Sequence, residues 1–222
     1  MTHVDPPRYE LVIFDWDGTV MDSTALIAAC IQEACRELGL AVPAEREAKW
    51  VIGLGFIQSV EHVAPGLDRA RQLELAERYR RHFVAREHEA PLFAGITETL
   101  AELRSRSRLL AVATGKARRG LDRALSSTGL KAHFDATRCA DEGFPKPHPD
   151  MVLRILEQTG VEAGRALMVG DTTHDLELAA NAGVDAVAVC YGAHDEAQLR
   201  SRNARHYAHS VDDLRRWLSL HA

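Results

Sequence analysis

Two aspartates, Asp15 and Asp17, stand at the end of an apolar run that covers residues 11–14. The run is short and rich in branched side chains, which is typical of a buried strand. Because side chains two positions apart in a strand point to the same side, the two carboxylates converge if the strand continues to them. Carboxylates this close repel each other unless a cation or a shared proton intervenes. The pair therefore indicates either a ligand site at a strand end or a polar turn.

Three later loops also carry polar residues of the kinds that catalytic sites use. Thr114 and Gly115 stand just before an expected helix, where they could bind an anion or, in the alternative, cap the helix. Lys146 lies among three prolines, so it is either held in place for a ligand or exposed in a rigid turn. Asp171 follows an apolar run, and Asp175 could be a second site carboxylate or an ordinary first-turn helix residue.

Hydrophobic periodicity predicts the elements that hold these loops. Apolar runs predict strands at residues 11–15, 108–113, 134–139, 166–169 and 186–189. Each of the four loops follows one of these strands. Helical spacing, with glycine or proline stops, predicts helices at residues 23–40, 44–51, 56–63, 68–89, 97–105, 117–127, 149–159, 173–182 and 212–220.

The two parts of the chain differ in pattern. Residues 21–90 read as consecutive helices with no strand signal, which indicates a small all-helical domain. After Pro91, strands alternate with helices, a pattern that predicts parallel strands joined by helical crossovers. We therefore expect an α/β protein with a Rossmann-like, three-layer parallel sheet. Residues 1–20 and 91–222 would form this core, and residues 21–90 would be inserted after its first strand.

Composition argues against several classes of function. The chain has 222 residues and a formal net charge of −5, so nucleic acid is not an expected partner. No apolar run is long enough to span a membrane, and residues 1–7 do not resemble a signal peptide. We expect a cytoplasmic protein, monomeric or homodimeric, with no membrane partner. The four cysteines lack metal-binding spacing and are expected to be reduced.

The four loops, in this order, closely resemble the motifs of the haloacid dehalogenase superfamily of phosphotransferases. The motifs as they stand here are Asp15-Trp16-Asp17-Gly18-Thr19, Thr114-Gly115, Lys146-Pro147, and Gly170-Asp171 with Asp175. The resemblance covers nearly the whole chain, and the helical insertion after the first motif is similar to the family's small cap. Asp22-Ser23 and the Lys-Pro-His-Pro form of the third motif are similar to the phosphoglycolate-phosphatase-like branch.

This resemblance implies catalytic roles for the residues of the first three motifs. Asp15 would attack phosphorus to form an aspartyl phosphate, and Asp17 would protonate the leaving oxygen and then activate water. Thr114 and the Gly115 N–H would bind the phosphoryl group, while Lys146 would neutralise both this group and Asp15. The family's dehalogenases lack the second aspartate, so the presence of Asp17 argues against dehalogenation.

The resemblance also implies a metal site. Asp15, Asp171 and the backbone carbonyl of Asp17 would bind Mg²⁺, which prefers a few carboxylates together with waters and phosphate oxygens. Asp175 would orient Lys146 or a metal-bound water. The sequence thus predicts that a divalent cation and a lysine together allow a carboxylate to approach a phosphate dianion.

The predicted cap contains residues that could contact the leaving group. Gly53 and Leu54 resemble the substrate-specificity loop of such caps, although they could form a plain turn between helices. Arg46 and Lys49 are candidates for binding a second phosphate or a carboxylate. The arginines of residues 68–89 spread around their helix, which is typical of a solvated face.

Four further residues belong to the second motif and to the link between the first motif and the cap. Gly115 stands where many members of the branch have asparagine, so a side-chain contact with substrate is missing there. Lys116 could add positive charge near the leaving group or face solvent. Thr19 and Val20 are the predicted hinge from which the cap moves.

These observations predict a Mg²⁺-dependent phosphatase that acts on a small phosphorylated metabolite, phosphoglycolate-like by resemblance. Alternatives with the same chemistry are a pyrophosphatase, a nucleotide or sugar phosphatase, and a phosphoglucomutase-like phosphotransferase. A non-catalytic phosphoacceptor switch would also use Asp, Thr and Lys at strand ends. Such a switch, however, has no use for Asp17 or for an inserted cap.

Overall fold

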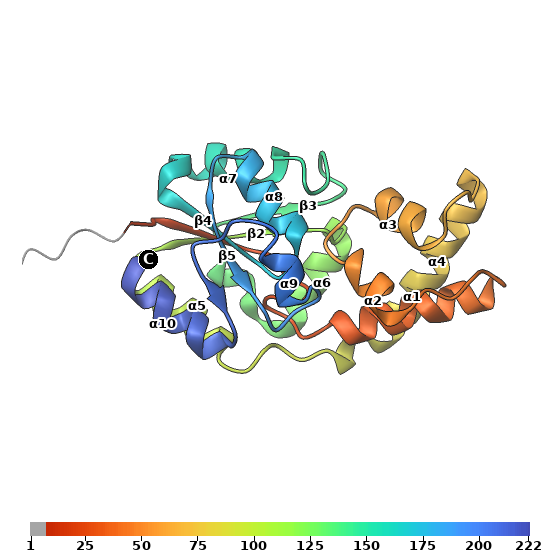
Figure 1. Cartoon of the computed structure of the whole chain (residues 1–222). Coiled ribbons are helices and arrows are strands. Elements are labelled where there is room, and N and C mark those ends of the chain that lie inside the picture. Colours follow the sequence, from red (N-terminus) through yellow and green to blue (C-terminus); the bar gives the residue numbers. More distant parts are fainter. Residues whose placement is uncertain (1–7) are drawn as a thin grey trace, which may run out of the picture.

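A parallel six-stranded sheet forms the centre of the protein, in the order β3-β2-β1-β4-β5-β6 (Figure 1). The structure is a computed structural model that describes residues 8–222. Residues 1–7, the segment that does not resemble a signal peptide, lie outside the described residues. The strands are β1 (Leu11–Phe14), β2 (Leu109–Thr114), β3 (Ala136–Cys139), β4 (Ala166–Gly170), β5 (Asp185–Val189) and β6 (Tyr207–Ala208). The first strand therefore lies between β2 and β4, with all three carboxyl ends at one edge.

Helices cover both faces of the sheet because the central strand buries alternate side chains on opposite sides. One face is covered by α5 (Ile96–Ser105), α6 (Arg118–Thr128) and α10 (Val211–His221), the other by α7 (Asp150–Thr159) and α8 (Thr173–Asn181). Val12 and Phe14 pack with the first group, and Leu11 and Ile13 pack with the second. Figure 1 shows α7 and α8 on the face opposite α5 and α10. The predicted three-layer α/β core is confirmed.

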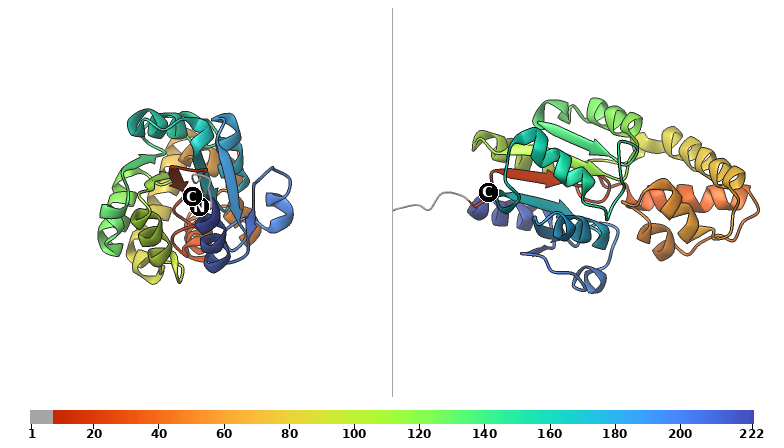
Figure 2. Two further views of the ribbon diagram at one scale, coloured as in Figure 1. Left: turned by 90° about the vertical axis from the view of Figure 1, so that its left-hand side faces the viewer. Right: turned by 90° about the horizontal axis from the view of Figure 1, so that it is seen from above.

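Four helices inserted between β1 and α5 form a separate group beyond the sheet (Figures 1 and 2). They are α1 (Thr24–Glu37), α2 (Glu45–Trp50), α3 (Phe56–Val63) and α4 (Arg69–Arg86), followed by a 3₁₀ turn at Glu87–Glu89. Ala34, Cys35, Val60 and Leu75 are buried together and give this group a small core of its own. The predicted all-helical cap is therefore part of the fold.

Predicted and observed elements differ mainly in short segments. The boundaries of the long helices and of the first five strands shift by a few residues, as is usual at element ends. The sequence did not predict α9 (Glu196–Leu199), β6, or the 3₁₀ turns at Leu130–His133 and Ala163–Arg165. These elements have two to four residues, too few to show a hydrophobic period. No helix within residues 8–222 is long and apolar enough to cross a membrane.

Candidate active site

The predicted site residues meet at the carboxyl ends of β1, β2 and β4, directly below the cap. A cavity of about 420 Å³ lies at this edge of the sheet. The predicted residues that line it are Asp15, Asp17, Thr114, Gly115, Gly53 and Leu54. Behind its core wall, three further predicted residues are completely buried: Lys146, Asp171 and Asp175. The structure thus brings all nine predicted positions into one region.

Lys146 lies between two carboxylates in the buried layer. Its Nζ lies 2.8 Å from Asp15 Oδ1 and donates to Asp175 Oδ1 at 2.6 Å. The other oxygen of Asp175 accepts from the Thr172 backbone N–H at 3.0 Å and from the Thr172 hydroxyl at 2.7 Å. Asp175 is therefore both the first-turn residue of α8 and the group that holds Lys146. The alternative of a surface lysine in a rigid turn is wrong, because Lys146 has no exposed side-chain area.

The carboxylate of Asp15 is exceptional among the charged groups of the site. Although Lys146 Nζ is at ion-pair distance, neither Asp15 oxygen accepts a well-formed hydrogen bond within the described residues. Burial raises the pKa of Asp15 to about 7, against the opposing effect of Lys146, and the charge of Asp175 raises it further. The two carboxylates in turn outweigh the effect of burial on Lys146 and hold its pKa above the usual range. Asp15 is thus a buried carboxylate that lines the cavity.

The residues present fit a hard divalent cation. Asp15, Asp171 and Asp175 each bring a carboxylate oxygen within 4.8 Å of the others. Burial raises the pKa of Asp171 well above its usual value, and the charges of Asp15 and Asp175 add to this effect. Among residues 8–222, only Lys146 forms ion pairs with these buried carboxylates, and a bound cation would relieve their repulsion.

The available oxygens favour the predicted ligand set of Asp15, Asp171 and the Asp17 carbonyl. Asp15 Oδ1 is paired with Lys146, but Asp15 Oδ2 and the Asp17 carbonyl accept no hydrogen bond from residues 8–222. One oxygen of Asp175 is paired with the charged Lys146 and the other with Thr172, whereas the partners of Asp171 are a neutral hydroxyl and a backbone N–H. Asp175 is therefore better placed to support Lys146 than to bind a cation itself.

Asp171 is held rigidly in place by the first motif and by the loop after β5. Its Oδ1 accepts from the Thr19 hydroxyl at 2.9 Å, and its Oδ2 accepts from the Ala193 backbone N–H at 2.7 Å. Gly18 has a φ of +83°, and a Cβ added there would lie 2.1 Å from Asp171 Oδ2. Only glycine therefore allows both this turn and the close approach of the carboxylate. Sequence reasoning gave Thr19 no role at the metal site, although it belongs to the first motif.

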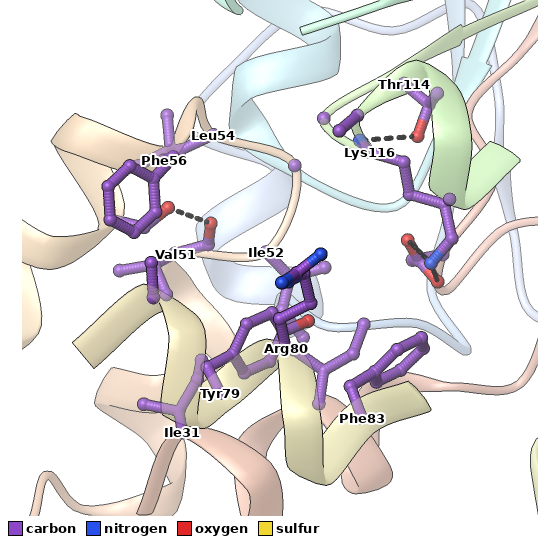
Figure 3. Close-up of a pocket in the computed structure, with 18 of the residues that line it drawn as sticks. Ile31, Val51, Ile52, Leu54, Phe56, Tyr79, Arg80, Phe83, Thr114 and Lys116 are labelled. Carbon is purple, nitrogen blue, oxygen red and sulfur yellow. Dashed lines mark hydrogen bonds and ion pairs between the residues drawn. The ribbon is translucent and has the colours of Figure 1, made fainter. Parts of the chain in front are cut away.

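Asp17 has a different environment, built partly from the cap. Lys116 Nζ donates to both Asp17 oxygens, at 2.9 and 2.8 Å, and the Ser23 hydroxyl donates to Oδ1 at 2.6 Å. Lys116 also lies over the ring of Phe83 in α4, with its Nζ 4.6 Å from the ring centroid (Figure 3). The lysine side chain is only 10% exposed, so the alternative that it faces solvent is wrong. Sequence reasoning missed Ser23, because its hydroxyl reaches Asp17 only in the folded turn before α1.

The second motif touches the cap loop through its backbone. Thr114 is the last residue of β2, and its Oγ1 accepts from the Lys116 backbone N–H at 3.2 Å. Helix α6 begins at Arg118 with Ala117 as its N-cap, so Thr114 is not a helix cap. A Cβ at Gly115 would lie 2.6 Å from the Gly53 carbonyl oxygen. This contact explains why a glycine suits the position where many of the branch have asparagine.

The basic cap residues fall outside the catalytic centre, with one exception. Arg46 lies 3.5 Å from Asp195 with its side chain 77% exposed, and Lys49 pairs with Glu45 at 2.6 Å. Neither lines the cavity, so the structure does not support them as binders of a second phosphate at this site. Most arginines of α4 pair with surface carboxylates, as predicted for a solvated face. Arg80 is the exception, because it lines the cavity as well.

A second contact between cap and core was not predicted. The Trp50 carbonyl at the end of α2 lies 2.9 Å from His174 Nε2 and 3.1 Å from His194 Nε2. His194 Nδ1 accepts from the Thr173 backbone N–H at 3.1 Å, which leaves Nε2 protonated and able to donate. Burial lowers the pKa of both histidines, to about 4 for His174, so both are neutral donors. Only the folded arrangement brings these distant residues together.

Comparisons with known proteins agree with this geometry. The sequence profile of the haloacid dehalogenase-like hydrolases matches residues 12–189. The chain is 35% identical to the "Probable phosphatase IndB" of Dickeya dadantii over 86% of this chain and 85% of that protein. It is 32% identical to a 5'-nucleotidase of Pseudomonas aeruginosa (96% and 97%) and 31% identical to a phosphoglycolate phosphatase of Agrobacterium fabrum (85% and 84%). The crystal structure of a predicted phosphatase from Clostridium acetobutylicum superposes with a TM-score of 0.85 at 24% identity, covering 95% of this chain and 98% of that one.

Proposed function

Because the chain belongs to the haloacid dehalogenase-like hydrolases and is a phosphatase, we propose that it hydrolyses small phosphate monoesters through an aspartyl phosphate on Asp15, with Mg²⁺ as cofactor. One observation carries the proposal. Asp15 is a buried carboxylate that lines a cavity, with Lys146 Nζ 2.8 Å from its Oδ1 and a second carboxylate, Asp17, in the same cavity wall.

The proposed reaction has two steps, each with a balanced transfer of groups. In the first, an Asp15 oxygen attacks phosphorus, the bond from phosphorus to the ester oxygen breaks, and Asp17 gives its proton to the departing alcohol. In the second, water attacks the phosphorus of the aspartyl phosphate and loses a proton to Asp17. Free phosphate leaves, and Asp15 is restored as a carboxylate.

Positioning and charge neutralisation supply most of the catalysis in such a transfer. Thr114 and the Gly115 N–H would bind the phosphoryl oxygens, and Lys146 would neutralise charge on Asp15 and on the transferred group. Asp15, Asp171 and the Asp17 carbonyl would hold Mg²⁺, which when bound offsets the repulsion between the phosphate and the carboxylates. Asp175 would keep Lys146 in position from behind.

The cap would close over the reacting groups and exclude water. We propose residues 21–90 as this movable unit and residues 8–20 and 91–222 as the catalytic core, with Gly53 and Leu54 contacting the substrate. In support, both residues line the cavity, and the Gly53 backbone lies against Gly115. The hinge at Thr19 and Val20 and a cytoplasmic location remain predictions.

The names of the relatives indicate different substrates for enzymes of one family. Phosphoglycolate and nucleotides are the substrates that two relatives' names indicate. A phosphoglucomutase-like transfer would use the same aspartyl phosphate but would convert a sugar 1-phosphate into its isomer instead of releasing phosphate. Phosphate release and isomer formation, measured in the same time course, separate the two reactions.

Rapid acid quenching with a ³²P-labelled ester tests the proposal. Asp15→Asn should abolish both turnover and labelling, whereas Asp17→Asn should accumulate labelled protein with a good leaving group and hydrolyse it slowly. Asp22→Asn, at an exposed position near the site, is the matched control and should behave like the wild type. Phosphate release by Asp15→Asn would refute the nucleophile assignment. A wild-type aspartyl phosphate that persists for minutes without turnover would instead support a phosphoacceptor switch.

A further inference from the structure

The cavity that contains Asp15 and Asp17 extends far into the cap. Its volume of about 420 Å³ lies within the range of roughly 300–1,000 Å³ typical of pockets for drug-sized ligands. The phosphoryl-binding residues occupy its core end. A two-carbon alcohol such as glycolate would therefore leave most of the cavity unfilled.

The cap part of the cavity is walled by apolar side chains from three helices and one loop. They include Ile31 of α1, Ile52 and Leu54 of the loop, Phe56 of α3, and Tyr79 and Phe83 of α4 (Figure 3). In the sequence, Gln72, Ala76, Tyr79 and Phe83 fall at helical spacing, and in the structure the last three line the cavity. The cap thus presents a continuous apolar surface to whatever the phosphoryl group is attached to.

Some of these apolar side chains remain exposed without a ligand. Phe56 and Val84 both line the cavity and are 37% and 41% exposed. Single exposed apolar residues are common, but apolar residues gathered in a cavity beside reacting groups indicate a binding site. An apolar ligand would cover them and gain the corresponding burial energy.

Most charged side chains of the lining come from the core, and Arg80 of α4 is the one from the cap. Asp15, Asp17 and Lys116 are at the core end, where Lys116 is already paired with Asp17. Arg119 and Arg123 come from α6 of the core, and Arg123 pairs with Glu87. Arg80, the one ionised cap residue in the lining, pairs with Glu77 at 2.5 Å. Charged groups are thus few in the lining compared with apolar ones, and Lys116, Arg123 and Arg80 already lie beside carboxylates of the protein.

We propose that the substrate is a phosphate monoester of an alcohol with a bulky apolar body, aliphatic or aromatic. This inference rests on the proposed phosphatase function and names the substrate class of the same site. The phosphoryl group binds at Asp15 and Thr114, and the leaving oxygen lies at Asp17. The body of the alcohol then passes Lys116 and Phe83 into the apolar part of the cavity.

A series of linear alkyl phosphates from ethyl to hexyl tests the inference on the wild-type enzyme. All members release primary alcohols of nearly equal acidity, so differences in kcat/KM report binding of the body of the alcohol. Each fully buried methylene is worth about fourfold in kcat/KM, so hexyl phosphate should exceed ethyl phosphate by up to about 200-fold. Phosphoglycolate should be a poorer substrate than hexyl phosphate.

The outcomes separate this inference from the function on which it rests. If the esters are hydrolysed but kcat/KM changes less than threefold along the series, or phosphoglycolate is preferred, the inference is wrong and the phosphatase stands. If no ester is hydrolysed in the presence of Mg²⁺, the proposed function itself fails, and the substrate class falls with it.

A matched pair of variants in α4 locates the effect in the cavity. Ala76 lines the cavity, whereas Ala85 is exposed on the same helix and does not. Ala76→Phe should reduce the hexyl-to-ethyl ratio of kcat/KM to near one, while Ala85→Phe should keep the wild-type ratio. An unchanged ratio in Ala76→Phe would place the alkyl chain elsewhere and overturn the inference. Thermal unfolding of both variants checks that they fold, and the wild-type series decides the question if one does not.

Discussion

Replacing Lys146 by methionine tests how the buried charges of the site balance. The Lys146 Nζ lies 2.8 Å from Asp15 Oδ1 and 2.6 Å from Asp175 Oδ1, and these side chains are at most 1% exposed. Methionine keeps a similar length and volume but removes the positive charge. Asp15, Asp171 and Asp175 would then repel one another with no buried cation of the protein between them.

The expected loss of stability is large for one substitution. Removing one partner of a buried ion pair costs about 3–5 kcal/mol, because the remaining charge is left buried and unpaired. For a chain of 222 residues each kcal/mol shifts Tm by about 2–4 °C, so Tm should fall by roughly 6–20 °C. Phosphatase activity should fall by at least about 100-fold, since a group that neutralises the transferred phosphoryl is lost.

Urea and thermal unfolding in a buffer with EDTA measure this effect, because a bound cation would otherwise mask it. Lys131→Met, at an exposed position, is the control and should change stability by less than about 0.5 kcal/mol. Adding Asp15→Asn to Lys146→Met should restore more than half of the lost stability, since it removes the charge that lost its partner. The reasoning is refuted if Lys146→Met is as stable as the wild type, or if the second substitution restores nothing.

Three further substitutions test other contacts of the site. Gly115→Ala would place a Cβ 2.6 Å from the Gly53 carbonyl oxygen, so the cap loop must move and kcat/KM should fall about tenfold or more. The control Gly164→Ala, which has open space around it, should leave kcat/KM unchanged. Mg²⁺ at a hundred times its Kd should stabilise the wild type by about 2.7 kcal/mol in thermal unfolding. The same stabilisation of the Asp171→Asn variant would contradict Asp171 as a ligand of the cation. Lys116→Met should lower the free energy of unfolding by roughly 1–3 kcal/mol in urea, since it removes two charge-assisted hydrogen bonds, and an unchanged value would contradict this pairing.

The fold could be predicted from the sequence because its long elements have clear periods. The run before Asp15 and the apolar run at β4 both read as buried strands, and both lie in the centre of the sheet. The carboxyl ends of parallel strands share one edge, so the loops after them had to meet. The strand β6 was not predicted because two residues are too few to show an alternation of apolar and polar side chains.

Contacts between cap and core could not be predicted, since they depend on how the two parts sit together. The sequence allows Lys116 to face either solvent or the leaving group. Its actual partner, Asp17, is 99 positions away in the chain. Gly115 was noted as a departure from the branch, but its reason, the backbone of Gly53, appears only when the cap loop is in place. Ser23 likewise donates to Asp17 across a turn that hydrophobic periodicity does not predict.

The two carboxylates of the first motif, Asp15 and Asp17, are chemically identical and differ in the residues that surround them. Asp15 takes its environment entirely from the core, where Lys146 and its supporting carboxylate are buried and fixed. Asp17 depends on Ser23 at the start of α1 and on Lys116, which packs on Phe83 of the cap. Opening of the cap would therefore change the surroundings of Asp17 and leave those of Asp15 in place. Under the proposed mechanism, protonation of the leaving group by Asp17 would then depend on a closed cap.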